Sequence, residues 1–463
     1  MTEKITILHT NDIHSHFENW PRIRRFILRR REQLNKHPNT TVLTFDLGDA
    51  IDRAHPLTEV TNGKANVELL NQIHYDAVTI GNNEGLTNTH EQLNELYTDA
   101  NFDVVLANIL DSKTRQIPKW AQPFKMITTP QKTRVLVIGL TAPYILTYPI
   151  LGWTPLSPDT VIPKILKENQ GQYDVVVLLS HLGLDVDRRL ARKFPQLDII
   201  IGAHTHHLLV KGERDNTSLL AAAEKWGHYV GEITIEVGKN HRIIKDRAVV
   251  TKTSTLPVDP ADEDEINEYQ QHGEKLLARN KLARIKAPMT TTLVGHSRLV
   301  DEGLHAIMEK AETQAGILNS GLFLTDLPTG IVDRNELHQM LPHAMHVMRV
   351  TLDGYNLWRL IKEMERNRNF LTKFQQKGMG FRGKYFGELH YNGLRYDKQA
   401  GQLFFREELV SPIKNYQIAM PDHYLFIPFF PTISIVGKNE ILYDQSLRDV
   451  FGDYLTKHYP LNG

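Results

Sequence analysis

Short runs of β-branched and other apolar residues recur through the first half of the chain, each followed by polar residues and then by helical spacing. This alternation is typical of an α/β fold, whose strands are buried on both faces between helices. We therefore predict a buried sheet system with helices such as residues 21–33 and 91–97 between its strands. The predicted strands are residues 5–8, 42–45, 77–80, 104–106, 135–140, 175–179 and 199–201.

The composition narrows the chemistry that is open to the chain. Its 463 residues include 54 Lys and Arg, 54 Asp and Glu, 22 His and no Cys. A formal net charge of zero gives no electrostatic reason to expect a nucleic-acid or membrane partner. The lack of Cys excludes disulfides, thiolate nucleophiles, iron–sulfur clusters and cysteine-type zinc sites, so His, Asp, Glu and Asn remain as the strong metal ligands.

The N-terminal segment has no apolar stretch of the kind that signal peptides contain, and no window of the sequence approaches 18 consecutive apolar residues. We therefore predict a cytoplasmic protein without a membrane partner. A chain from which a signal peptide had been removed would show the same pattern, and that alternative stays open.

A linker helix is predicted between two domains. Asp259-Pro260 has the pattern of a helix N-cap followed by a proline. Acidic residues at 262–265 and basic residues toward the other end match the polarity of a helix dipole, and Pro288 is expected to end the helix. The sequence thus predicts a first domain at 1–256, a linker helix at 257–286 and a second domain at 287–463.

Polar clusters follow five of the predicted strands. Because ligands bind at the carboxyl ends of strands in α/β sheets, we expect these clusters to converge on one edge. Together they offer two carboxylates, one amide and four imidazoles, which is too many for one catalytic zinc and suits two divalent ions that share a carboxylate. The candidate ligands are Asp12, His14, Asp49, Asn82, His181, His204 and His206.

The ordered motifs Asp-x-His, Gly-Asp, Gly-Asn-x-Glu, a single His after a strand and Gly-x-His-x-His resemble those of the calcineurin-like metallophosphoesterases. The start, LHTNDIHSHF, resembles in particular the 5′-nucleotidase, UDP-sugar hydrolase and 2′,3′-cyclic phosphodiesterase branch. The resemblance implies an α/β fold with an N-terminal four-layer αββα metallophosphatase domain, a linker helix and a C-terminal α/β 5′-nucleotidase-type substrate domain.

The resemblance also implies two divalent metal ions, with Mn, Zn, Fe and Co equally compatible with oxygen and imidazole ligands. Such paired ions acidify a bridging water and clamp the attacking and leaving oxygens of an in-line displacement. One ion would be held by Asp12, His14, Asp49 and His206, and the other by Asp49, Asn82, His181 and His204.

The activity that the resemblance implies is hydrolysis of a small phosphate ester, with a nucleotide as the first candidate partner and 5′-nucleotidase-like chemistry. A bridging hydroxide would attack in line. Three alternatives stay open: a 2′,3′-cyclic-nucleotide phosphodiesterase, a UDP-sugar phosphodiesterase, and a ligand-binding homologue with weakened catalysis.

Position 83 departs from the family pattern, which usually has His there and in this chain has Asn83. Asn83 and Asp49 are the expected catalytic residues. An amide donates a hydrogen bond but transfers no proton at neutral pH, so we expect slower turnover of poor leaving groups. His16 or His207 would have to substitute for the missing imidazole.

The expected substrate residues lie in the second domain, where the resemblance is looser. Asn319 and Gly321 stand where the family has Asn-Gly-Gly, and Arg298 is matched to a substrate arginine. His343 and Tyr424 are expected to hold a flat ring between them, or else to pack as ordinary aromatic residues. Residues 378–383 fit G-x-G-x-x-G, but no strand or helix is predicted beside them, so a glycine-rich loop is expected instead of a dinucleotide site.

Overall fold

A computed structural model describes residues 2–378 and 380–462 of the chain. The chain divides into two compact units, Met1–Gly273 and Glu274–Gly463, and each is described by itself. Within the described residues, no helix is both long enough and apolar enough to cross a membrane.

The first unit contains two six-stranded sheets with parallel strands at their centres. The first sheet has antiparallel strands at one edge only, and the second has an antiparallel strand at each edge. Each predicted strand has a counterpart, but the strands predicted at 77–80 and 104–106 are only two residues long, at Ala77–Val78 and Asp103–Val104. The first sheet has the order β14 (Ile243–Lys252), β13 (Tyr229–Val237), β1 (Glu3–Thr10), β2 (Thr40–Asp46), β3 (Ala77–Val78) and β4 (Asp103–Val104). The second has the order β11 (Glu213–Asp215), β12 (Ser218–Ala221), β10 (Ile199–Gly202), β9 (Val175–His181), β7 (Arg134–Thr141) and β6 (Phe124–Thr128).

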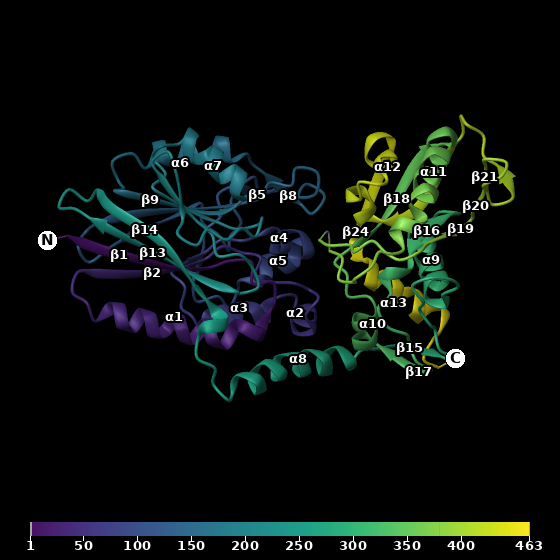
Figure 1. The fold of residues 1–463 in the computed structure, drawn as a ribbon, viewed down its shortest axis with the longest axis horizontal. Coiled ribbons are helices and arrows are strands. Elements are labelled where there is room, and N and C mark those ends of the chain that lie inside the picture. The colour runs from purple at the N-terminus through teal and green to yellow at the C-terminus, as the bar shows by residue number, and fades with distance from the viewer. Residues whose placement is uncertain (1, 379, 463) are drawn as a thin grey trace. The chain divides into compact units, whose positions relative to one another are not determined.

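Helices cover the outer face of each sheet, which gives the four-layer arrangement αββα (Figure 1). Helices α6 and α7 pack on the second sheet, and α1 and α3 pack on the first. A short pair of strands, β5 (Ile109–Asp111) and β8 (Trp153–Pro155), lies outside both sheets. The helices are α1 (Trp20–Asn35), α2 (Pro56–Thr61), α3 (Lys64–Asn71), α4 (Asn82–Thr87), α5 (His90–Leu96), α6 (Pro158–Glu168) and α7 (Leu184–Lys193).

Alternation of side chains along the strands builds three layers of core in this unit. In β7, Val135 and Val137 face the other sheet, whereas Leu136 and Ile138 face α6 and α7. All four side chains are fully buried. Strands buried on both faces read as continuous apolar runs, which is why the sequence located them well.

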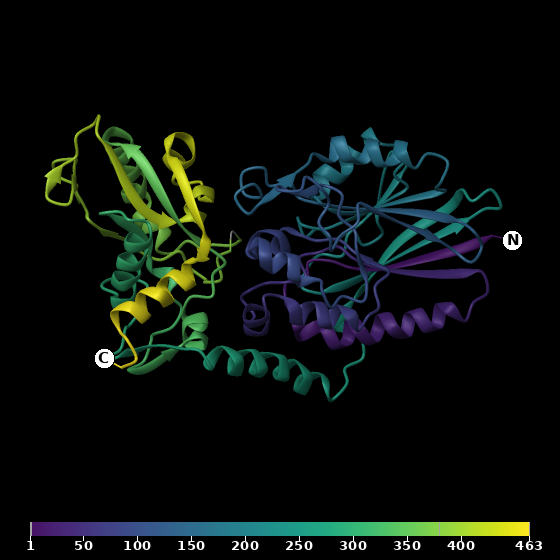
Figure 2. The same cartoon turned by 180° about the vertical axis from the view of Figure 1, so that it is seen from behind.

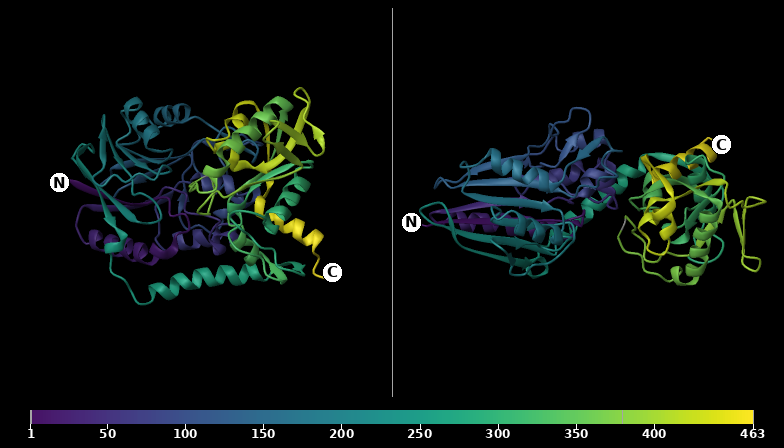
Figure 3. Two further views of the ribbon diagram at one scale, coloured as in Figure 1. Left: turned by 45° about the vertical axis from the view of Figure 1, so that its right-hand side comes forward. Right: turned by 90° about the horizontal axis from the view of Figure 1, so that it is seen from above.

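The second unit is built on a mixed sheet with helices on both faces (Figures 2 and 3). Helices α9, α10 and α13 pack on one face, and α11 and α12 pack on the other. Its sheet has the order β19 (Leu389–Asn392), β16 (Gly316–Asn319), β23 (Asn415–Pro421), β18 (His346–Asp353) and β24 (Lys438–Ser446). Its helices are α9 (Arg298–Lys310), α10 (Arg334–Met340), α11 (Gly354–Leu371), α12 (Pro431–Val436) and α13 (Leu447–His458). A smaller sheet contains β20 (Leu394–Asp397), β21 (Gln402–Phe405) and β22 (Glu408–Leu409).

The helix between the two units is shorter than the predicted 257–286. Helix α8 spans Asp262–Ala278, and β15 (Lys281–Ile285) follows it and pairs with β17 (Gly330–Asp333). Ala283 and Ile285 are buried while the residues beside them are not, which is the period-two pattern of a strand. The basic residues of this segment resemble the end of a helix in the sequence, and only the pairing with β17 reveals the strand.

Residues 378–383 form no strand or helix in the part that the structure describes, as expected for a loop. Met379 of this motif lies outside the described residues.

Candidate metal centre

The predicted clusters converge at the carboxyl ends of parallel strands from both sheets of the first unit. Asp12 and His14 follow β1, and Asp49 follows β2. The remaining candidates stand at the start of α4, at the end of β9 and just after β10: Asn82, His181, His204 and His206. Six of these residues form two groups whose ligand atoms lie within 4.8 Å of one another: Asp12, His14 and His206, and Asp49, His181 and His204.

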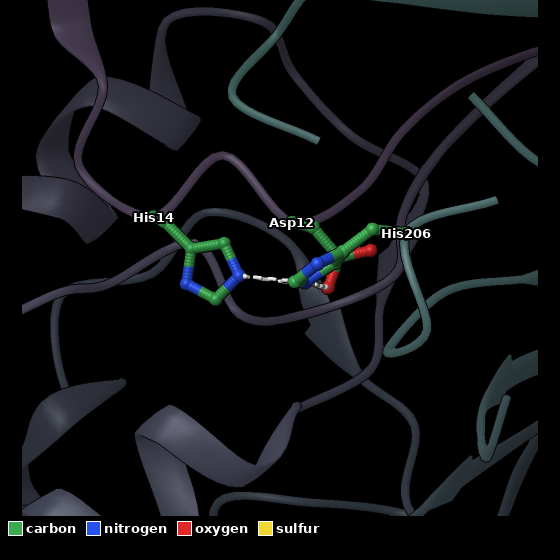
Figure 4. Close-up of side chains that lie close together, drawn as sticks. All are labelled: Asp12, His14 and His206. Carbon is green, nitrogen blue, oxygen red and sulfur yellow. Dashed lines mark hydrogen bonds and ion pairs between the residues drawn. The ribbon is translucent and has the colours of Figure 1, made fainter. Parts of the chain in front are cut away.

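The first group is shown in Figure 4. The Nε2 atoms of His14 and His206 are 3.2 Å apart. Asp12 Oδ1 lies 3.8 Å from His14 Nε2 and 3.5 Å from His206 Nε2. Three ligand-type atoms from two different sheets therefore face one point.

Asp49 links the two groups. Its Oδ2 lies 3.3 Å from His181 Nε2, in its own group, and 3.7 Å from His14 Nε2, in the other. Its second oxygen, Oδ1, accepts a hydrogen bond of 2.7 Å from the backbone N–H of Asn83. A carboxylate held in this way has one oxygen fixed and the other directed at both groups, as a shared ligand requires.

Five of the seven candidate ligands have a positive φ angle, a backbone conformation that is unfavourable for residues with a Cβ atom. The φ angles of Asp12, His14, Asp49, His204 and His206 are 51°, 50°, 51°, 73° and 56°. Positive φ at residues other than glycine is uncommon and costs free energy, and it persists where surrounding structure imposes it, often at functional sites. The sequence motifs gave no indication of these conformations.

Close backbone contacts between loops impose this geometry. The N–H groups of Asp12 and His14 donate to the carbonyl oxygens of Gly48 and Asp49, at 3.0 and 2.8 Å. Gly48 has φ of 82°, and a Cβ there would lie 2.1 Å from the nitrogen of Gly81. Only glycine allows the loops after β2 and β3 to approach this closely.

The side chain of Glu84 links the same loops by hydrogen bonds. Its buried carboxylate accepts hydrogen bonds from the backbone N–H groups of Asp49 and Gly81, both at 2.8 Å, and of Ile51 at 3.1 Å. Sequence reasoning named Glu84 only as part of a motif. Its position three residues after Gly81, at the start of a helix, is the capping signal that indicates such a role.

The imidazoles differ in their electrostatic surroundings. Burial and the neighbouring His181 lower the pKa of His204 to about 4. Burial also lowers the pKa of His14, although Asp49 and Asp12 raise it. Burial disfavours the charged forms of both Asp49 and His181. The attraction between the Asp49 carboxylate and the His181 imidazolium outweighs burial, so the pKa of Asp49 is lowered and the pKa of His181 is raised. Binding of a cation would displace the His181 proton.

The residues present fit divalent metal ions. Among the described residues, the buried Asn82 Oδ1 has no hydrogen-bond partner, and the buried His181 Nε2 makes no well-formed hydrogen bond but lies 3.3 Å from Asp49 Oδ2. Buried polar atoms are ordinarily paired, so an amide oxygen without a partner beside a carboxylate and an imidazole indicates a cation site. His181 Nδ1 lies 2.7 Å from the carbonyl oxygen of Leu47, which is the usual partner behind a metal-binding histidine.

Asn83 contacts the candidate ligand His14. The two histidines proposed to substitute for the missing imidazole, His16 and His207, make no hydrogen bond to a candidate ligand among the described residues. His16 Nδ1 pairs with Glu18 Oε1 at 2.7 Å, and its ring stacks on Trp226. His207 Nδ1 lies 2.9 Å from Thr205 Oγ1. Tyr144, which the sequence did not indicate, places its ring against His204 with centroids 6.2 Å apart.

The expected substrate residues of the second unit are largely inside its core. Tyr424 is fully buried and donates to Asn319 Oδ1 at 3.0 Å, while Asn319 Nδ2 donates to the carbonyl oxygen of Phe386 at 2.6 Å. A Cβ on Gly321 would lie 2.0 Å from the carbonyl oxygen of Tyr385, so close backbone packing explains this glycine. Arg298 Nη1 donates to the carbonyl oxygens of residues 287 and 288, both at 3.2 Å.

His343 and Tyr424 pack as ordinary buried aromatic residues in the core, which is the second of the two interpretations that the sequence left open. His343 is fully buried, its Nδ1 accepts from the backbone N–H of Arg382 at 2.9 Å, and its Nε2 donates to the carbonyl oxygen of Leu322 at 2.7 Å. The ring stacked on it is Phe381, with centroids 4.9 Å apart and planes 3° from parallel. Sequence spacing could not show that the glycine-rich loop supplies this ring.

Comparison with known proteins agrees with this architecture. Residues 5–208 match the model of the calcineurin-like phosphoesterases, and residues 283–426 match the C-terminal domain of 5′-nucleotidases. The chain is 35% identical over 460 residues to YunD, an uncharacterised metallophosphoesterase of Bacillus subtilis (strain 168), covering 97% of this chain and 98% of that protein. The chain belongs to the calcineurin-like metallophosphoesterases. As a member of this family it is a metal-dependent phosphoester hydrolase, and it carries the C-terminal domain of the 5′-nucleotidases.

More distant relatives share the fold. The chain superposes on a putative 5′-nucleotidase from Staphylococcus aureus with a TM-score of 0.70 at 16% identity, covering 99% of this chain and 98% of that one. It superposes on the NAD nucleotidase of Haemophilus influenzae with a TM-score of 0.65 at 14% identity, covering 99% and 97%. Human 5′-nucleotidase is 23% identical over 305 residues, which cover 58% of this chain and 52% of that protein.

Proposed function

We propose that this metallophosphoesterase hydrolyses a phosphate monoester of a small metabolite at two divalent metal ions, with a nucleoside monophosphate as the first candidate. The observation that carries the proposal is the position of Asp49, one oxygen of which faces both candidate metal groups. Relatives named as 5′-nucleotidases and a NAD nucleotidase support a nucleotide as the substrate class.

In this proposal the predicted ligand sets are kept. Asp12, His14, Asp49 and His206 hold one ion, and Asp49, Asn82, His181 and His204 hold the other. When bound, such ions acidify water and stabilise negative charge on phosphoryl oxygens.

The chain's own residues set the charge and geometry of the site. Only two of the seven ligands are carboxylates, so the loaded site keeps a positive charge that attracts a phosphate dianion. Asn83 donates its backbone N–H to Asp49, which keeps the shared carboxylate in place. Glu84 keeps the loops that carry Asp49 and Asn82 together.

The first test is hydrolysis of an activated aryl phosphate by the full chain with added Mn²⁺, followed by a panel of nucleoside monophosphates, cyclic nucleotides and nucleotide sugars. Replacing Asp49→Ala is expected to lower turnover by at least about 100-fold, because charge stabilisation at the reacting phosphate is lost. The exposed Asp99→Ala is the matched control. Turnover by the intact chain that does not exceed that of Asp49→Ala would favour a binding module, and preference for diesters would favour a phosphodiesterase.

A further inference from the structure

The side chain of Asn83 contacts one predicted ligand of each metal ion, Asn82 and His14. Its Oδ1 accepts a hydrogen bond from Asn82 Nδ2 at 3.1 Å. Its Nδ2 donates to the carbonyl oxygen of Ile51 at 2.9 Å and lies 3.0 Å from His14 Nδ1. One amide is therefore bonded to a candidate ligand of each ion.

For Asn82, this contact is favourable to metal binding. Because Asn82 Nδ2 is directed at Asn83 Oδ1, the oxygen of the same amide is directed away from it. That oxygen is buried and has no hydrogen-bond partner. An amide binds a cation through its oxygen, so Asn83 holds Asn82 in the orientation that a metal ion needs.

For His14, the same amide is unfavourable. The ring faces Asp12, Asp49 and His206 with Nε2. A histidine that binds a metal ion through Nε2 carries its proton on Nδ1 and donates it to an acceptor. The atom beside His14 Nδ1 is the donor Nδ2 of Asn83.

The Asn83 amide cannot relieve this conflict by turning over. The Ile51 carbonyl oxygen accepts from Asn83 Nδ2, and it would face an oxygen if the amide were reversed. In the reversed amide the NH₂ group of Asn83 would also face the NH₂ group of Asn82, so two donors would meet without an acceptor. His181 has no such conflict, because its Nδ1 lies against the Leu47 carbonyl, an acceptor.

We infer that Asn83 is a positioning residue that makes the two metal sites unequal. The site of Asp49, Asn82, His181 and His204 binds its ion first and more tightly, and the site that includes His14 binds second and more weakly. The inference rests on the two-metal centre of the proposed function and names how that centre is loaded.

The test is a calorimetric titration of chelator-treated full-length protein with Mn²⁺. Two binding steps are expected, with affinities at least ~10-fold apart, since partners behind a ligand change metal affinity by about 10- to 100-fold. His204→Ala is expected to remove the tight step and His206→Ala the weak one. Equal affinities, or the reverse assignment of the steps, would overturn the inference.

Two substitutions then separate the two roles of Asn83. In Asn83→Asp, one carboxylate oxygen accepts from His14 Nδ1 and also faces the Ile51 carbonyl oxygen, while the other still accepts from Asn82. The lost bond to Ile51 destabilises the metal-free and the metal-loaded protein alike, whereas the acceptor for His14 Nδ1 favours the loaded protein, so the weak step is expected to tighten by about 10-fold or more. In Asn83→Ala the Asn82 amide is released, and the tight step is expected to weaken by about 10-fold.

Thr87 supplies matched controls, because it lies one turn later on α4 and, within the described residues, its hydroxyl bonds only the Asn83 backbone carbonyl. Thr87→Asp adds the same charge as Asn83→Asp, and Thr87→Ala tests loss of helix stability. Both are expected to change each affinity by less than about 3-fold, well below the effect of an altered ligand partner.

An unchanged weak step in Asn83→Asp, or an equal gain in Thr87→Asp, would overturn the inference. These outcomes differ from failure of the proposed function, in which wild-type protein loaded with two ions hydrolyses no phosphate ester.

Discussion

Single residues of the candidate metal centre were predicted from the sequence, and six of them lie together in two groups, but their conformations and partners were not predicted. The motif spacing placed Asp12, Asp49 and His204 at the ends of strands, where period-two and strand-end arguments apply. Their positive φ angles arise from hydrogen bonds between loops that are distant in sequence, so no local pattern encodes them.

Asp187 shows the same dependence on tertiary packing. This residue of α7 is 1% exposed, and its carboxylate accepts a hydrogen bond from the Ser180 hydroxyl. Burial raises its pKa from 3.8 to about 7, although the Ser180 hydrogen bond lowers it. Between these two pH values the folded state keeps a proton that the unfolded state has lost, so this contribution to stability is lost as the pH rises.

We therefore expect Asp187→Asn, which is neutral at every pH, to lose less stability than the wild type between pH 5 and pH 8. The difference is expected to be about 2–3 kcal/mol, at 1.36 kcal/mol for each pKa unit. Urea unfolding of metal-free protein at the two pH values measures it. Asp185→Asn is the control, because that side chain lies on the same helix and is 99% exposed. Parallel pH profiles for wild type and Asp187→Asn would refute the argument.

At the scale of elements, the strands of the first unit were predictable and the segment after α8 was not. Buried parallel strands give continuous apolar runs, whereas β15 has exposed basic residues on one side and depends on pairing with β17. Helix α4 is a second case, because its six residues are stabilised by Glu84 more than by any periodicity.

Glu84→Ala is expected to destabilise the first unit and weaken metal binding. The substitution leaves three buried backbone N–H groups without an acceptor, and each costs about 1–3 kcal/mol. The three groups together give an expected loss of about 3–9 kcal/mol. Thermal unfolding and the metal content of purified protein give the two readouts.

The control is Glu91→Ala on α5, because Glu91 is exposed. A loss of stability no larger than in Glu91→Ala would show that water replaces the carboxylate and that Glu84 does not hold the loops together.

At the scale of the whole molecule, the division into two units and the fold class of the first unit were predictable from the sequence. The packing of side chains in the core of the second unit was not. The family resemblance implied a substrate role for Asn319, and it left open whether His343 and Tyr424 hold a ring or pack as ordinary aromatic residues. All three side chains are buried in the core. Which aromatic residue contacts which depends on the complete tertiary structure, as the stacking of Phe381 on His343 illustrates.

Metal removal is expected to affect the two units differently. All candidate ligands belong to Met1–Gly273, and each unit has its own apolar core. At metal concentrations about 100 times the dissociation constant, a bound ion adds about 2.7 kcal/mol. A chelator should therefore lower the melting temperature of one transition by about 5–10 °C and leave the other in place, as measured by differential scanning calorimetry. A single transition that shifts as a whole would show that the units unfold together.

Each candidate metal group takes residues from the loops of both sheets. Asp12 and His14 follow a strand of the first sheet and His206 follows a strand of the second, and Asp49 is combined with His181 and His204 in the same way. Sliding of one sheet over the other would change several distances within both candidate groups at once. The packing between the two sheets therefore fixes the geometry of both groups together.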